Sequence, residues 1–544
     1  MANFRYSNLP ASLLTDGDCD YSADGGGEPH HPSVPSMPDV LGQSVSEFRI
    51  WPEMTTEGQG IDPLAYDQLP VRMFPPSTLG TSKDLIMGKK TGRQLSDVLV
   101  ASSKLFVNGL QKPEKEYLSV MNKDAAPTTR QRLSAEEIMR VAGMRFIQSK
   151  GLGDNDNSSP MHTFGSELSA EDTKDVELSQ ILMSAAEKVG EQQFDHAKRL
   201  LFLCELSSKG KTPAQRIVLS FAEALGERID KMTGKYDPEM QEPRTRQCLS
   251  VNLTLLTCHR LLPFTQITQF TSAQVLVENT ATANRIHVIN LAIRSGIQMI
   301  VLMKALHDRK SCALEHLKVT AVAIEDRETV EESGRILGNA AISMGLNFSF
   351  RVIYPPDFCD VRKDQFDIED GETVAVYAPM VLETMISRQS SLERLMMVIR
   401  NLNPSVMIVT EVQANHNSPS FLKRFTEVLF FYSTFIDCLE TCSANDGSNN
   451  MISEQCLFSG VRNMLSSEGH ERTSRNVKID VWRAFFSRNG LVEIGLSEDC
   501  LYQATLVSKQ FPWASFCTIE YDGKCLLVGW RGTPLFSVSA WKFR

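Results

Sequence analysis

The sequence predicts an α/β fold built on a doubly wound parallel sheet, and the clearest single sign of it is the stretch from 285 to 306. This stretch opens with Ile286, Val288, Ile289 and Leu291, an apolar run rich in β-branched residues that is typical of a strand buried on both faces. A turn containing Gly296 follows, and apolar residues then return at helical spacing. Strand, tight turn and helix are the opening half of a βαβ unit.

The same strand-and-helix rhythm repeats further along the chain. Apolar, β-branched runs predict strands at 319–324, 348–353, 373–377 and 406–410, and a helix is predicted between the first two at 331–346. Strands that alternate with helices favour a parallel sheet with helices on both faces. Near the end of the chain, 526–530 is predicted as a strand, with 519–521 as its antiparallel partner.

Before this α/β region the pattern is helical. Ser134 and Glu137 form a capping box, which predicts a helix over 138–148. Three apolar stripes at helical spacing follow between 178 and 229. Their apolar positions either form intramolecular core or present a face to a partner, and seven of them are candidates for the partner face: Leu178, Ile181, Leu182, Leu200, Leu201, Phe221 and Leu225.

Composition narrows the function classes. The chain has 544 residues, and its 42% hydrophobic content is enough for a sizeable core. No apolar run reaches membrane-spanning length and the N-terminus lacks the form of a secretory signal, so neither a membrane nor an export route is expected. The 12 cysteines include no CxxC pair and no zinc-like Cys/His spacing, which favours reduced thiols in the nucleus or cytosol.

Residues 1 to about 130 differ from the rest. Nine prolines fall between Pro29 and Pro76, and sustained periodicity is missing, so this segment is predicted to be a disordered N-terminal arm. The arm carries 13 acidic and 7 basic residues in its first 100, which is −6 of the net charge of −10. The remaining charge of −4 belongs to residues 101–544, which are therefore close to charge balance. A dedicated DNA-binding domain usually has a strongly basic face, so this balance argues against DNA binding but leaves room for a local basic patch.

Several motifs in consistent order resemble the GRAS family of plant transcriptional regulators. Ile286, His287, Val288, Ile289 and Asn290 resemble the family's VHIID motif, with Asn where the family usually has Asp. Segments at 214–225, 270–276, 317–320 and 410–432 resemble its first leucine-rich, FTANQAI, LRIT and PFYRE regions. The spacing of the C-terminal residues resembles its SAW region: Trp482, Gly490, Trp530, Ser539, Ala540 and Trp541.

The resemblance implies an architecture and a function. The expected fold is Rossmann-like, similar to class I methyltransferases, with an α-helical cap. The GRAS domain would span 131–544, with the mainly helical cap and leucine-rich region at 131–262 and the α/β core at 263–544. The expected function is regulation of transcription in the nucleus, with the cytoplasm also open, through binding to other transcription factors and to GRAS relatives as a homo- or heterodimer. The DELLA hormone-response signature is absent.

Two alternatives remain open at this stage. Direct DNA binding would use a basic patch formed by Arg244, Arg246 and Arg260 together with His259, although a solvated surface explains these residues as well. A methyltransferase or small-molecule-binding relative would need a Gly-rich turn after the first strand and an acid after the second. Glu325 fits the second requirement, but the turn has one glycine, so no cofactor and no catalytic activity are expected. His287 is predicted to be a hydrogen-bonded core residue, and Asn290 to cap the turn.

Overall fold

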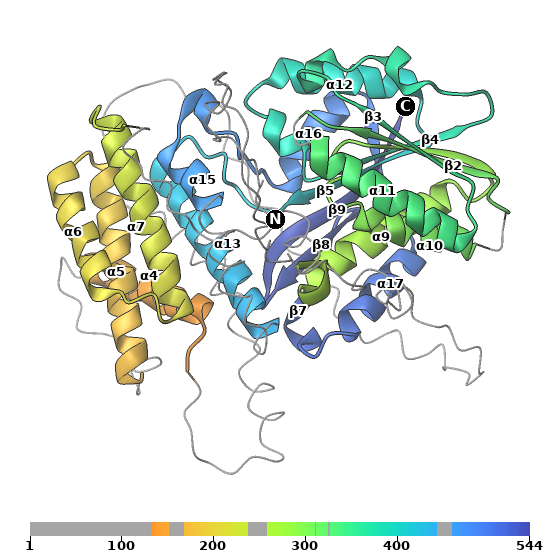
Figure 1. The fold of residues 1–544 in the computed structure, drawn as a ribbon. Coiled ribbons are helices and arrows are strands. Elements are labelled where there is room, and N and C mark those ends of the chain that lie inside the picture. The colour runs from red at the N-terminus through yellow and green to blue at the C-terminus, as the bar shows by residue number, and fades with distance from the viewer. Residues whose placement is uncertain (1–131, 152–167, 238–257, 310–311, 325–326, 443–459) are drawn as a thin grey trace, which may run out of the picture. The chain divides into compact units, whose positions relative to one another are not determined.

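The computed structural model describes residues 132–151, 168–237, 258–309, 312–324, 327–442 and 460–544 (Figure 1). The arm predicted at 1–130 lies outside these ranges. All described residues fall in the larger of the two units into which the chain divides. Among them, no helix is both long and apolar enough to span a membrane.

Nine strands of the described residues form one sheet. In chain order they are β1 (Arg285–Asn290), β2 (His316–Val322), β3 (Phe348–Ile353), β4 (Thr373–Pro379), β5 (Val406–Val412), β6 (Leu491–Ile494), β7 (Cys517–Asp522), β8 (Cys525–Trp530) and β9 (Thr533–Phe543). Their spatial order is β3-β2-β1-β4-β5-β9-β8-β7, and β6 pairs with β9. The first five strands are parallel, whereas β9, β8, β7 and β6 pair antiparallel. The predicted doubly wound sheet is confirmed, as are the predicted strands.

Helices cover both faces of this sheet (Figure 1). One face packs against α12 (Gln389–Leu402) and α16 (Ile479–Arg488), which share a hydrophobic core with β1, β4, β5 and β9. On the other side of the sheet lie α9 (Pro263–Asn279), α10 (Ile297–His307), α11 (Arg327–Met344) and α17 (Glu498–Lys509). Short 3-10 helices connect these elements: η2 (Phe358–Asp360), η3 (Lys363–Phe366), η4 (Leu382–Met385), η6 (Gly469–Glu471) and η7 (Ala514–Phe516).

The remaining helices form the cap. They are α4 (Ala135–Gly151), α5 (Ala170–Gly190), α6 (Phe194–Ser207), α7 (Pro213–Met232), α13 (Phe421–Cys442) and α15 (Arg462–Ser466). The predicted capping box opens α4, because Ser134 N–H donates to Glu137 at 2.8 Å and Glu137 N–H donates to Ser134 Oγ at 3.3 Å. Two of these helices, α13 and α15, come from the C-terminal half of the chain.

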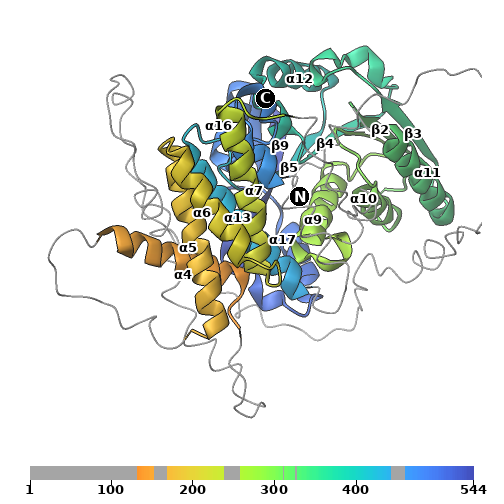
Figure 2. The same cartoon turned by 60° about the vertical axis from the view of Figure 1, so that its left-hand side comes forward.

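Helix α13 joins the cap to the sheet (Figures 1 and 2). It contacts α4, α5 and α7 on one side and β8 and β9 on the other. Asp437 of α13 accepts a hydrogen bond from Trp530 Nε1 of β8 at 2.7 Å and pairs with Arg531 at 2.9 Å. These contacts are buried, so the cap and the sheet share one continuous interior.

Candidate functional site

The central strand β1 ends in a turn that is stabilised by a hydrogen bond to the side chain of the last residue of the strand. Asn290 is fully buried, and its Oδ1 accepts a hydrogen bond from Ala292 N–H at 2.9 Å, so the predicted turn cap is present. Gly296 precedes α10 with φ of 72°, a conformation that glycine adopts without strain. Arg294 adopts φ of 50°, a conformation that costs a non-glycine residue energy.

His287, in the middle of β1, is a buried and hydrogen-bonded imidazole, as predicted. Its Nε2 lies 2.8 Å from Thr320 Oγ1, and its Nδ1 lies 3.2 Å from a carboxylate oxygen of Glu372. Lys318 lies 3.5 Å from the same carboxylate group. Burial lowers the pKa of His287 to about 4, so the ring is neutral near pH 7. Because His287 is fully buried, we assign it a role in folding rather than in proton transfer.

A small cavity lies at the carboxyl ends of β1, β4 and β5, where ligands bind in many doubly wound sheets. Its volume is about 40 Å³, and its polar lining includes Thr265, Arg294, Tyr377 and Thr410. Arg294 Nη2 donates to the carbonyl oxygen of Met380 across this site at 2.9 Å. Burial lowers the pKa of Arg294 and raises that of the nearby Glu411 carboxyl well above its usual range.

The residues around this cavity do not fit a nucleoside-sized methyl donor. A volume of about 40 Å³ has room for about three water molecules, whereas small-molecule sites usually offer roughly 300–1,000 Å³. Glu325, the acid expected after the second strand, lies outside the described residues.

The predicted C-terminal tryptophans lie in the core. Trp541 of β9 packs 4.6 Å from the ring of Phe486, which stacks on Trp482 at 5.6 Å. All three rings are buried, as is Trp530, and the Trp541 ring also donates from Nε1 to Ser539 Oγ at 2.9 Å. Ala540 and Ser539 are buried in β9, and Gly490 turns the chain into β6 with φ of 79°. This constellation therefore contributes to folding.

The helical cap places most of the candidate partner-face residues inside. The five that are buried in the core are Leu178, Leu182, Leu201, Phe221 and Leu225, while Ile181 and Leu200 are half-buried. These five cannot contact a partner, because the packing of α5, α6 and α7 against each other and the rest of the cap covers them. Helix α6 also has three exposed apolar residues, Phe202 (61% exposed), Leu203 (43%) and Leu206 (68%), which we call the α6 surface.

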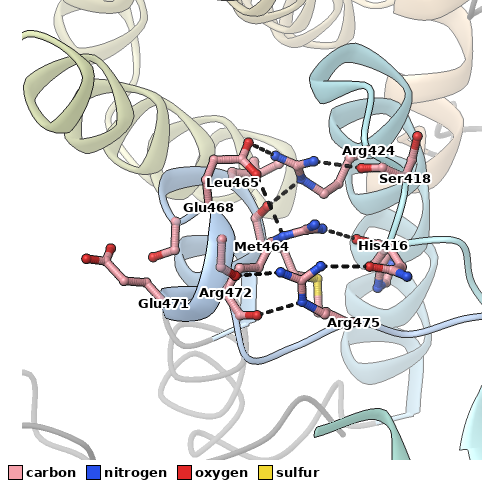
Figure 3. Close-up of polar contacts among 12 residues, drawn as sticks. His416, Ser418, Arg424, Met464, Leu465, Glu468, Glu471, Arg472 and Arg475 are labelled. Carbon is pink, nitrogen blue, oxygen red and sulfur yellow. Dashed lines mark hydrogen bonds and ion pairs between the residues drawn. The ribbon is translucent and has the colours of Figure 1, made fainter. Parts of the chain in front are cut away.

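Of the four residues predicted for the basic patch, the structure describes His259 and Arg260. Arg244 and Arg246 lie outside the described residues, and Arg260 is exposed. His259, in contrast, is buried, with Nδ1 2.7 Å from Gln269 Oε1, and burial lowers its pKa to about 4. It therefore carries no charge near pH 7 and contributes nothing to a basic surface. Arginines gather instead around Glu468, where residues far apart in the sequence meet (Figure 3).

Known proteins resemble this chain in sequence and in fold. A model of the GRAS domain family matches residues 178–542. DELLA protein RGL1 of Arabidopsis thaliana is 30% identical over 371 residues, which cover 68% of this chain and 70% of that protein. DELLA protein GAI1 of Vitis vinifera is 27% identical over 373 residues, but this chain spans only 62% of its length. The crystal structure of SCL7 from Oryza sativa superposes with a TM-score of 0.58 at 22% identity, covering 67% of this chain and 99% of SCL7.

Proposed function

The chain belongs to the GRAS domain family of plant transcriptional regulators, and on that premise we propose that it acts in the nucleus by binding other regulatory proteins. The partners are other transcription factors and GRAS domains, either a second copy of this chain or a relative. The α6 surface is the observation that carries this proposal. The small cavity at the carboxyl ends of β1, β4 and β5 supports this proposal, since a volume of that size suits water rather than a cofactor.

The α6 surface has the chemistry of a partner contact. Phe202 and Leu206 are four residues apart, so they lie one above the other on the same helix face. Within the described residues α6 packs mainly on α5 and α7, and Figure 1 shows it at the outer side of the cap. A contiguous exposed apolar stripe on a folded domain marks an interaction site more often than scattered apolar residues do. A second GRAS domain would bury this stripe against an apolar helix of its own.

Replacing both Phe202 and Leu206 by glutamate should weaken association with a GRAS partner by about 30-fold or more, the loss typical of one central interface residue. The free energy of unfolding should change by less than about 1 kcal/mol, because neither side chain contributes to the core. Sedimentation of the purified chain and co-precipitation with a GRAS relative measure association, and circular dichroism measures folding. The matched control is Ile342→Glu on α11, where an isolated isoleucine is 79% exposed. Association that persists in the double variant, or that falls equally in the control, would exclude the α6 surface.

The enzyme alternative has its own test. S-adenosylmethionine at millimolar concentration should leave the melting temperature unchanged, because the turn after β1 carries Arg294 and a single glycine. A ligand present at a hundredfold excess over its Kd stabilises a protein by about 2.7 kcal/mol, which differential scanning fluorimetry detects as a shift of several degrees. Such a shift would reopen the enzyme hypothesis, and Glu325→Ala should then abolish it.

A further inference from the structure

Three arginines pair with one carboxylate at the junction of α7, α13 and the segment after η6, and a fourth arginine lies beside them. Figure 3 shows three members of this group, Arg424, Arg472 and Arg475. We call Arg228, Arg424, Arg472 and Arg475 the arginine cluster, and the shared carboxylate belongs to Glu468. Arg228, Arg424 and Arg472 each form an ion pair with it. Three of the four arginines are buried, at 8%, 0% and 4% exposure for Arg228, Arg424 and Arg472.

The surrounding backbone fixes these guanidinium groups in place. Arg424 donates from Nε to the carbonyl oxygen of Met464 at 2.8 Å and from Nη1 to that of Ser418 at 2.7 Å. Arg472 donates from Nη1 to the carbonyl oxygen of His416 at 2.9 Å. Donors held by several backbone carbonyls are already oriented before a ligand arrives, which reduces the entropy lost on binding.

The cluster holds more positive charge than its carboxylate neutralises. Among the described residues, Glu468 is the only carboxylate in ion-pair distance of Arg228, Arg424 or Arg472. The guanidinium group of Arg475 donates to neutral oxygens, including Asn417 Oδ1 at 3.0 Å and the carbonyl oxygen of Arg472 at 2.9 Å, and its backbone N–H donates to a carboxylate oxygen of Glu383 at 3.0 Å. The three arginines paired with Glu468 carry three positive charges against its one negative charge, which leaves an excess of two.

Part of this donor set is unused. The Nε of Arg472 is buried without a hydrogen-bond partner and lies 3.9 Å from Glu468 Oε2. Burial, and after it the positive charges of Arg424 and Arg475, lower the pKa of Arg472 to about 10. The Glu468 side chain, in contrast, is 48% exposed. It can therefore leave the cluster by rotating into solvent.

We propose that the arginine cluster is a binding site for a phosphorylated serine or threonine side chain of a protein partner, and that Glu468 occupies the anion position until the phosphoryl group displaces it. A phosphoryl group carries close to two negative charges and three acceptor oxygens, so it neutralises the excess charge better than one carboxylate. Clusters of arginines are a recurrent means of recognising phosphorylated side chains. This site uses none of the α6 residues and does not depend on the function proposed for them.

A phosphorylated side chain fits this geometry better than duplex nucleic acid does. Three guanidinium groups pair with the single carboxylate of Glu468 and are held by backbone carbonyls, whereas a duplex presents a row of phosphates to an exposed basic surface. The rim also carries Glu471, whose side chain is 73% exposed and would repel a polyanion.

The test uses the full chain and a capped pentapeptide with one phosphoserine between glycines, and the unphosphorylated peptide serves as the blank. Isothermal titration at constant ionic strength should detect binding of the phosphorylated peptide only. Glu468→Gln should tighten this binding by about tenfold, since it removes the internal competitor, and Arg475→Gln should weaken it by about tenfold, which is the effect of losing one charge-assisted contact. Arg475 is the most exposed member of the cluster, so its replacement disturbs folding least.

Arg335→Gln is the matched control, because this arginine lies on α11 with its side chain 72% exposed. It should bind the phosphopeptide like the wild-type chain. If Arg475→Gln does not fold, the comparison of wild type with Glu468→Gln decides. Equal heats for the two peptides in both of those proteins would overturn the proposal. Tighter binding of a DNA duplex than of the phosphopeptide, with the same dependence on Arg475, would assign the cluster to nucleic acid instead.

Discussion

Replacing Trp541 by alanine should lower the free energy of unfolding by roughly 3–5 kcal/mol, the cost of removing a large buried ring. Trp541 is 2% exposed and lies in β9, which pairs with β5 at Met407 and with β6 at Glu493. Its ring packs on Phe486, so its loss leaves a cavity where the sheet meets α16. Against a total stability of roughly 5–15 kcal/mol, this change should reduce soluble yield and abolish all interactions together.

Chemical denaturation followed by circular dichroism measures this effect, and a panel of partner assays accompanies it. Trp513→Ala is the matched control, since Trp513 is 39% exposed and stacks only at the surface on Phe516, 6.0 Å away. The control should cost less than about 1 kcal/mol. Normal unfolding of Trp541→Ala with loss of a single partner would instead identify Trp541 as an interface residue.

Much of the sheet was predictable because β1, β2, β4 and β5 are buried on both faces, whereas the edge strand β3 is mainly half-buried. The run at 348–353 coincides with β3, and the runs at 373–377 and 406–410 lie within β4 and β5. The start of β2 was missed, since His316 and Lys318 interrupt the apolar pattern. Lys318 lies in the strand because its ammonium group pairs with the buried Glu372, a partner 54 positions further along the chain. Such pairing depends on the tertiary fold and leaves no local signal.

The candidate sites were harder to predict for two physical reasons. Helix α6 has apolar residues on several sides, so periodicity alone could not show that Leu201 faces the core while Phe202 and Leu206 face outward. The arginine cluster brings together residues as distant as Arg228 and Arg475, and only the packing of α7 against α13 and α15 makes them neighbours. The short spacing of Glu468, Arg472 and Arg475 in the sequence indicates that these charges lie close together. It does not indicate a cluster by itself, because Arg424 and Arg228 join it only in the folded chain.

Acidification should destabilise the chain through three buried neutral histidines, with an effect of roughly 6 kcal/mol by pH 5. Burial is the largest cause in each case and lowers the pKa of His259, His287 and His416 from 6.5 to about 4. The unfolded chain therefore binds these protons first. The stabilisation is fully present above pH 6.5 and is lost as the pH falls from there toward 4, at about 2 kcal/mol per histidine by pH 5.

His416 allows this contribution to be measured separately. Its ring is fully buried against Phe431, its Nδ1 lies 2.8 Å from Asn476 Oδ1, and the positive charges of Arg472 and Lys478 further disfavour protonation. Buried carboxyls with raised pKa values, such as Glu411 and Asp437, act in the opposite direction and reduce the total loss. They are common to wild type and His416→Gln, so the difference between the two proteins isolates the histidine.

The His416→Gln variant should be less stable than wild type at pH 7.5, because it loses a shaped aromatic ring, but it should lose about 2 kcal/mol less stability on going to pH 5. Urea denaturation at the two pH values measures both quantities. His470→Gln is the matched control, since it makes the same substitution at an exposed histidine. Parallel pH profiles for wild type and His416→Gln would mean that His416 has the same pKa in the folded and the unfolded chain, in which case the folded chain would have to accommodate its charge beside Arg472.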